Sequence, residues 1–74
     1  MAEPLWRVSF EVDRIKGGCG SGYMLMRNYS EPTSKDVLKE INKVGHIELD
    51  TDYGRQLCTA QNVANVFDVI VEEV

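Results

Sequence analysis

The sequence has few of the residues on which metal sites and disulfide frameworks depend. It contains two cysteines, Cys19 and Cys58, and one histidine, His46, and no CxxC pair occurs. Small secreted domains that rely on disulfides carry several pairs of cysteines, so two free thiols are favoured here. The three potential zinc ligands lie at spacings that fit no zinc-finger motif. We therefore expect neither a metal nor a cofactor.

The sequence also lacks a long apolar run and an opening in which basic residues precede an apolar segment. Its 74 residues are 43% hydrophobic and 27% charged, which is too apolar for intrinsic disorder and too interrupted for a membrane span. Without a signal-like opening, the expected location is the cytoplasm. A chain of this length is expected to form one domain, residues 1–74, with a small core.

Basic residues are scarce in the last part of the chain. Residues 44–74 contain one base, Arg55, and six acids, whereas residues 1–43 contain seven bases and six acids. The formal net charge is −4. Nucleic-acid-binding proteins concentrate Lys and Arg on one face, so this distribution argues against nucleic acid as the partner.

Residues 31–45, EPTSKDVLKEINKVG, predict an α-helix with both ends marked. Thr33 can cap the first turn, Asp36 has the position of the acid in a capping box, and Gly45 supplies a left-handed stop. One apolar stripe follows the helical period and consists of Val37, Leu38, Ile41 and Val44. A helix of about three turns is marginal alone in water, so this stripe must pack on a sheet.

Two alternating segments predict strands near the ends of the chain. In residues 5–12 the apolar face consists of Trp6, Val8, Phe10 and Val12. In residues 66–74, VFDVIVEEV, the side chains expected to face the core are Phe67, Val69 and Val71. These strands should form part of the sheet that covers the helix.

Residues 13–22 contain four glycines in their last six positions, and we interpret the whole segment as a mobile loop. Residues 23–29, YMLMRNY, predict a second strand antiparallel to the first. Its inward face is either the set Tyr23, Leu25 and Tyr29 or the pair Met24 and Met26. Apolar residues on both faces indicate that the sheet leaves one face open.

After the helix, residues 47–49 predict a short strand and residues 52–54 a turn, followed by a short strand or irregular stretch through Leu57 and Cys58. The order is therefore strand, strand, helix, minor hairpin, strand. Such an order predicts an α+β fold, specifically a two-layer sandwich of a small, mostly antiparallel sheet with one main helix on one face.

No catalytic motif is complete. The glycine-rich segment fits neither a P-loop nor a dinucleotide fingerprint, because a strand rather than a helix follows it. Cys19 lies beside Arg14 and Lys16, which could lower its pKa, but a catalytic thiol needs a base and His46 is the only imidazole. We expect a protein that is not an enzyme.

Glu48, Asp50 and Asp52 alternate along an extended segment, so their carboxylates share one face at intervals of about 7 Å. Such a row can contact a basic protein surface. The alternatives are a solvated edge that blocks strand pairing and a divalent-ion site, although the pattern of a calcium loop is not satisfied. The predicted partner-binding residues are Glu48, Asp50, Asp52, Tyr53, Arg27 and Tyr29.

These features favour a non-enzymatic protein–protein interaction module, an adaptor or inhibitor, that binds a basic protein through an exposed sheet face or edge and its acidic C-terminal third. Its element order and acidic surface are similar to those of several small phage-encoded inhibitors of host enzymes, a likeness of size and order without a shared motif. The alternative is a small nucleic-acid-binding domain. That domain would use the sheet aromatics with Arg7, Arg14, Lys16 and Arg27.

Overall fold

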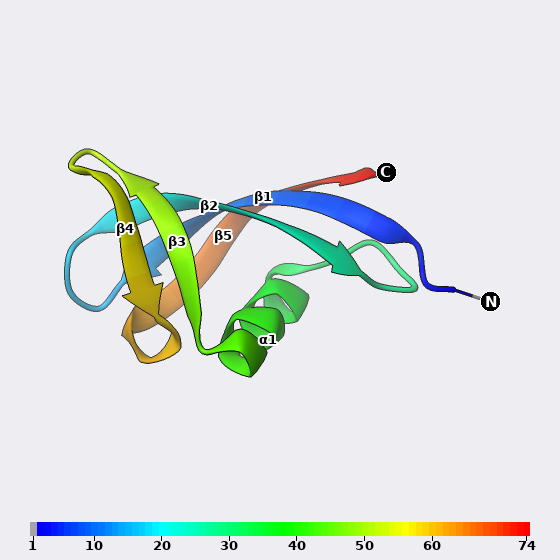
Figure 1. The fold of residues 1–74 in the computed structure, drawn as a ribbon, viewed down its shortest axis with the longest axis horizontal. Coiled ribbons are helices and arrows are strands. Elements are labelled where there is room, and N and C mark those ends of the chain that lie inside the picture. The colour runs from blue at the N-terminus through cyan, green and yellow to red at the C-terminus, as the bar shows by residue number, and fades with distance from the viewer. Residues whose placement is uncertain (1) are drawn as a thin grey trace.

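The computed structural model describes residues 2–74, which form five strands in one sheet and one α-helix (Figure 1). In chain order these elements are β1 (Leu5–Arg14), β2 (Cys19–Arg27), α1 (Ser34–Val44), β3 (His46–Thr51), β4 (Gly54–Thr59), the 3-10 turn η1 (Ala60–Asn62) and β5 (Val63–Glu73). All strand pairs are antiparallel, and the strand order is β4-β3-β2-β1-β5. The predicted α+β class is confirmed. Among the described residues, no helix has the length and apolar character needed to cross a bilayer.

The helix begins and ends at the predicted residues. The Thr33 side chain accepts a hydrogen bond from the Asp36 N–H, and the Asp36 carboxylate accepts one from the Thr33 N–H at 2.9 Å. Gly45 adopts a left-handed φ of 97° and donates its N–H to the Ile41 carbonyl at 2.8 Å. Both ends are thus fixed by contacts within a few residues, which is why the sequence predicts them.

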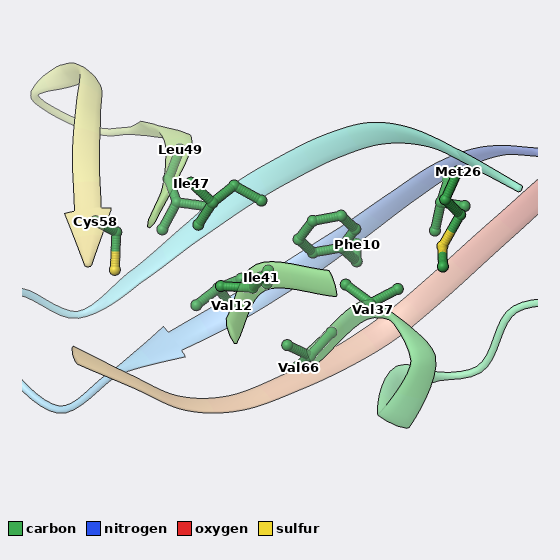
Figure 2. Close-up of a cluster of buried hydrophobic side chains, with 10 residues drawn as sticks. Phe10, Val12, Met26, Val37, Ile41, Ile47, Leu49, Cys58 and Val66 are labelled. Atoms are coloured by element: carbon green, nitrogen blue, oxygen red, sulfur yellow. The ribbon is translucent and has the colours of Figure 1, made fainter. Parts of the chain in front are cut away.

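The buried stripe of α1 is narrower than the sequence indicates. Val37 and Ile41 are fully buried, whereas Leu38 is half-buried and Val44 is exposed. Figure 2 shows Val37 and Ile41 lying close to Phe10 and Val12 of β1 in one cluster. The buried hydrophobic residues of that cluster are Val8, Phe10, Val12, Met26, Val37, Ile41, Ile47, Leu49, Cys58 and Val66.

Strand β2 begins earlier than predicted, and its glycines are structural. Gly20 and Gly22 lie within β2, so the interpretation of residues 13–22 as one mobile loop is wrong. A Cβ on Gly22 would lie 2.4 Å from Cε2 of Phe10, closer than any real contact allows. The absence of a side chain there is what admits the Phe10 ring, a tertiary reason for glycine in a strand.

The inward face of β2 carries Met24 and Met26, the second of the two predicted alternatives. Met24 pairs with Val8 and Met26 with Trp6, so the methionines share the face that β1 turns toward the core. Tyr23 and Leu25 point the other way and are 55% and 53% exposed. The pairing register therefore decides which face of β2 points to the core, a question that periodicity alone leaves open.

Strand β5 departs from simple alternation at Asp68. Ser9 pairs with Ile70 and Glu11 with Phe67, so β5 has one residue more than β1 between these pairs, and Asp68 has a φ of 51°. Such a bulge reverses the faces on either side of it. Val66 is consequently buried, and the prediction that Phe67 faces the core is wrong. Val69 and Val71, beyond the bulge, pack against the core as predicted.

Strands β2 and β3 are joined at a single pair of residues, Ser21 and Asp50. By contrast, β1 pairs with β2 from Leu5–Arg27 to Asp13–Cys19. Figure 1 shows the β3–β4 hairpin running away from the rest of β2, with α1 below the opening. The sheet is therefore split along part of its length.

We expect Gly22→Ala to lower the free energy of unfolding by about 1–3 kcal/mol, because the new methyl group must displace the Phe10 ring from a packed core. Urea denaturation followed by circular dichroism measures this change. The neighbouring Ser21→Ala, at an exposed position, is the control and should cost less than about 0.5 kcal/mol. Equal losses in the two variants would contradict the assigned role of Gly22.

Candidate partner-binding surface

Four of the six predicted partner-binding residues lie together on the β3–β4 hairpin. Glu48 and Asp50 occupy exposed positions of β3, and Asp52 and Tyr53 form its turn. The turn is fixed by Thr51, whose hydroxyl accepts from the Tyr53 N–H at 3.1 Å and donates to the Gly54 carbonyl at 2.8 Å. The hairpin thus presents a group of carboxylates beside a tyrosine that is 87% exposed.

The other two, Arg27 and Tyr29, lie at the far end of β2. Asp50 of β3 lies opposite Ser21 of β2, and Arg27 is six residues further along β2. This separation corresponds to about 20 Å of extended chain. The structure does not bring these two residues together with the acidic hairpin, so the six residues form two separate groups.

Within the acidic group, the carboxylates differ in their surroundings. Asp50 pairs with Arg55 across the hairpin, with Oδ1 and Nε 3.3 Å apart. Both side chains are mostly exposed, so this ion pair contributes little to stability. Glu48 and Asp52 form no ion pair with any described residue. Their charges therefore remain available to a partner.

The outer face of the sheet, turned away from the core, carries exposed apolar side chains on both sides of β1, whose own outward side chains between them are polar. Strand pairing places Tyr23 and Ile70 on either side of Ser9 of β1. Ile70 is 70% exposed. We call this region the outer-face patch, and it consists of Tyr23, Leu25, Phe67 and Ile70.

Arg7 crosses the same face and links three strands. It pairs with Leu25 of β2 and Glu72 of β5, and its Nη1 donates to the Glu72 carboxylate. Hydrogen bonding to Tyr23, followed by the hydrogen bond and charge of Glu72, raises the pKa of Arg7. The guanidinium is thus permanently charged and already engaged within the protein.

A groove runs along the opening between β2 and β3, and we call it the β2–β3 groove. Its wider part has a volume of about 310 Å³ and is lined by Ser21, Tyr23, His46, Ile47, Glu48, Asp50 and Arg55. A second part of about 210 Å³ lies against the end of the helix and is lined by Tyr23, Met24, Leu25, Glu40, Ile41, Val44, His46 and Ile47. One part is therefore mainly polar and the other mainly apolar.

The residues considered for catalysis do not meet. Cys19 and His46 lie on opposite sides of the Ser21–Asp50 pair, about 20 Å apart by strand rise. Within residues 2–74, no group of three or more His, Cys, Asp or Glu side chains is arranged to hold a metal ion. Both cysteines are free thiols, with Cys19 exposed and Cys58 buried.

The environment of Cys19 is the reverse of the activated thiol considered from the sequence. Although the side chain lies at the surface, partial loss of hydration raises its pKa, and the negative charges of Asp13 and Glu11 act in the same direction. Its Sγ lies 3.6 Å from Oδ1 of Asp13. Arg14 has the opposite effect but does not outweigh the others. The thiol is therefore a poorer nucleophile than an ordinary cysteine.

Several residues of the alternative, nucleic-acid-binding prediction already form hydrogen bonds to other protein atoms. Trp6 is half-buried and donates Nε1–H to the Asn28 carbonyl at 2.9 Å, so its ring is not free on the outer face. Arg14 donates to the carbonyls of Gly17 and Gly18 and to Gln56. Arg27 donates to the Glu3 carbonyl at 2.9 Å.

Leu25, Phe67 and Ile70 are not among the binding residues that the sequence predicts. Periodicity leaves the face of Leu25 open, and it predicts that Phe67 faces the core because the bulge at Asp68 leaves no mark in the apolar pattern. Ile70 falls on the outward side of VFDVIVEEV in the sequence as in the structure. An isoleucine among acids on a solvent face was the signal available for this surface.

Comparison with protein-family models, curated proteins and solved structures finds no match for this chain.

We expect Asp13→Asn to accelerate alkylation of Cys19 by iodoacetamide at pH 8. The substitution removes a negative charge beside the sulfur, which lowers the thiol pKa and increases the thiolate fraction. Mass spectrometry of the modified chain gives the rate, and Cys58, being buried, should stay unmodified in the folded protein. Glu31→Gln, an exposed acid in the segment before α1, is the control. An unchanged rate in Asp13→Asn would refute this account of the thiol.

Proposed function

We propose that the protein is a non-enzymatic protein–protein interaction module, an adaptor or inhibitor that acts in the cytoplasm. The observation that carries this proposal is the outer-face patch. Tyr23, Leu25 and Ile70 are each more than half exposed on one face of a 74-residue domain. We take α1 and the sheet as two layers, so that the helix covers the inner face and leaves the outer one open.

The energetic argument rests on what the exposed side chains would gain from a partner. Complete burial of one large aliphatic or aromatic side chain contributes about 1.5–3 kcal/mol. Covering Tyr23, Leu25 and Ile70 together is worth several kilocalories per mole before the cost of association. Apolar anchors surrounded by a polar rim are typical of protein interfaces. Arg7 and Glu72 would form part of that rim, since they lie on the same face.

The hairpin carboxylates favour a partner with a basic surface. Glu48 and Asp52 are exposed and unpaired within residues 2–74, and they lie on one side of the sheet, beyond β2. At this position their charge would act on encounter and orientation rather than on the buried contact. Nucleic acid is less well supported as a partner, because Arg7, Arg14 and Arg27 already bind protein atoms.

The test is capture of partner proteins from a cell lysate by the tagged full chain. We expect wild type to retain a protein that Ile70→Ser loses, because a hydroxyl replaces the apolar anchor on the outer face. Ile15→Ser is the matched control, since Ile15 is similarly exposed, at 65% against 70% for Ile70, but lies in the β1–β2 connection, outside the patch. If nothing is retained, or if Ile70→Ser retains the same proteins as wild type, the proposed function is wrong.

The acidic hairpin gives a second prediction, measured with the captured partner by surface plasmon resonance. Replacing Glu48, Asp50 and Asp52 with Gln or Asn keeps their size and removes their charge. We expect association to slow by roughly threefold to tenfold and to lose most of its salt dependence, because rim charges act mainly on the association rate. Thermal stability should change little, since these carboxylates are exposed. More self-association with unchanged binding would instead identify the row as a guard against strand pairing.

A further inference from the structure

The β2–β3 groove is bordered on one side by backbone groups of β2 that have no strand partner. Arg14 donates its N–H to the Gly18 carbonyl and Asn28 to the Pro4 carbonyl, which fixes which residues of the β1–β2 ladder are hydrogen-bonded pairs. In an antiparallel pair the backbone groups of successive residues point to opposite edges. Those of the even-numbered residues of β2 therefore point to β1. The groups that point away from β1 belong to Tyr23 and Leu25, which line the groove, and to Arg27, further along the same edge.

The other border of the groove is equally open. Ala60 donates its N–H to the Gly45 carbonyl, which continues the β3–β4 ladder and directs the backbone groups of Ile47 and Leu49 toward β4. The N–H and C=O groups of His46 and Glu48 therefore point toward β2. The one pair that joins these strands within residues 2–74 is Ser21–Asp50, so beyond it both edges are unpaired.

The side chains along this opening favour an occupant that alternates between apolar and basic residues. Ile41 and Ile47, from the core, and Val44 and Leu25, both exposed, line the part of the groove beside the helix. An extended segment puts every second side chain on one face, so apolar residues at alternate positions that face the core would contact Val44 beside Ile41 and Ile47, whereas Leu25 points to the outer face. Main-chain hydrogen bonds to the open edge would supply the remaining contacts.

The charges around the groove indicate which residues of the occupant would alternate with its apolar ones. Glu48, Asp50 and Glu40 line the two parts, and the one Arg or Lys that lines them, Arg55, is already paired with Asp50. Lys or Arg on the occupant would complement the unpaired carboxylates of Glu40 and Glu48.

The same charges argue against a second copy of this chain as the occupant of the groove. Its strand with a long free edge is β5, which pairs with β1 alone and carries Asp68, Glu72 and Glu73 and no base. Insertion of β5 would therefore place carboxylates against Glu40 and Glu48, and like charges across strands are destabilising.

We infer that the β2–β3 groove binds an extended segment of another protein, with apolar and Lys or Arg residues in alternation, by adding it as a strand to the edge of β2. This inference rests on the proposed function and specifies where a partner chain would attach. The contact differs in kind from the outer-face patch, because it depends on backbone donors and acceptors at Tyr23, Leu25 and Arg27.

The experiment uses the full ¹⁵N-labelled chain and a synthetic octapeptide of alternating lysine and valine, acetylated and amidated at its ends. We expect saturable shifts of the Tyr23, Leu25, Arg27 and Glu48 amides, and slower hydrogen exchange of the three β2 amides, because a strand now accepts their hydrogen bonds. A control peptide is N-methylated at every second residue, so that all backbone nitrogens on the edge that faces β2 carry a methyl group. It keeps the charge but loses the hydrogen-bond donors on that edge, and it should not bind. If both peptides bind equally, strand addition is excluded.

Charge is tested with a peptide of alternating glutamate and valine, which should bind about tenfold more weakly, as expected from a few cross-strand charge contacts. Glu40→Gln with Glu48→Gln should weaken binding of the lysine peptide, whereas Glu31→Gln with Glu73→Gln, at two exposed acids outside the groove, should not. Circular dichroism verifies that both double variants fold.

Absence of shifts at millimolar peptide, or shifts confined to the amides of Ser9 and Ile70 on the outer face, would overturn the inference. The second result would leave the proposed function intact, since the outer-face patch would then be the binding surface. Loss of partner capture by both wild type and Ile70→Ser would instead overturn the proposed function. The two failures are therefore distinguishable.

Discussion

The contact between the Phe10 ring and Gly22 is the constraint on which the arrangement of the strands depends. Phe10 lies on β1, between β2 and β5, and reaches across β2 at a position where any side chain would collide with it. On the other side of β1, the bulge at Asp68 falls opposite the same residue. Phe10 is thus bordered by a missing side chain in one neighbouring strand and an extra residue in the other. These adjustments let one large ring fill the centre of a small core, next to Val37 and Ile41 of the helix.

What the sequence predicts correctly is local, and what it misses depends on contacts between distant residues. The ends of α1 follow from Thr33, Asp36 and Gly45, which interact within one turn. The face of β1 follows from alternation alone. Gly22, by contrast, looks like a loop residue unless the Phe10 ring twelve positions earlier is known to need its space. The faces of β5 depend on a bulge that leaves no sign in the order of apolar residues.

The candidate binding surface divides in the same way. Alternation placed Glu48, Asp50 and Asp52 together, and they do lie on one hairpin. Whether Arg27 lies near them depends on the register between β2 and β3, and the residue pattern of one strand alone does not specify that register. Exposure of Ile70 follows from its position between acids in a terminal strand, but its proximity to Tyr23 depends on two further pairings, both through Ser9. Side-chain patterns thus predict what a strand exposes, and pairing decides which strands share a surface.

The single pair between β2 and β3 has a mechanical consequence. A continuous ladder resists separation of its strands, because several hydrogen bonds must break together. Here one junction, Ser21–Asp50, connects the hairpin backbone to the rest of the sheet, and Leu49 and Cys58 attach it to the core through side chains. Beyond this junction no ladder of hydrogen bonds fixes the hairpin against β2 within residues 2–74. The separation of the two edges along the groove is therefore set by side-chain packing and not by a ladder of hydrogen bonds.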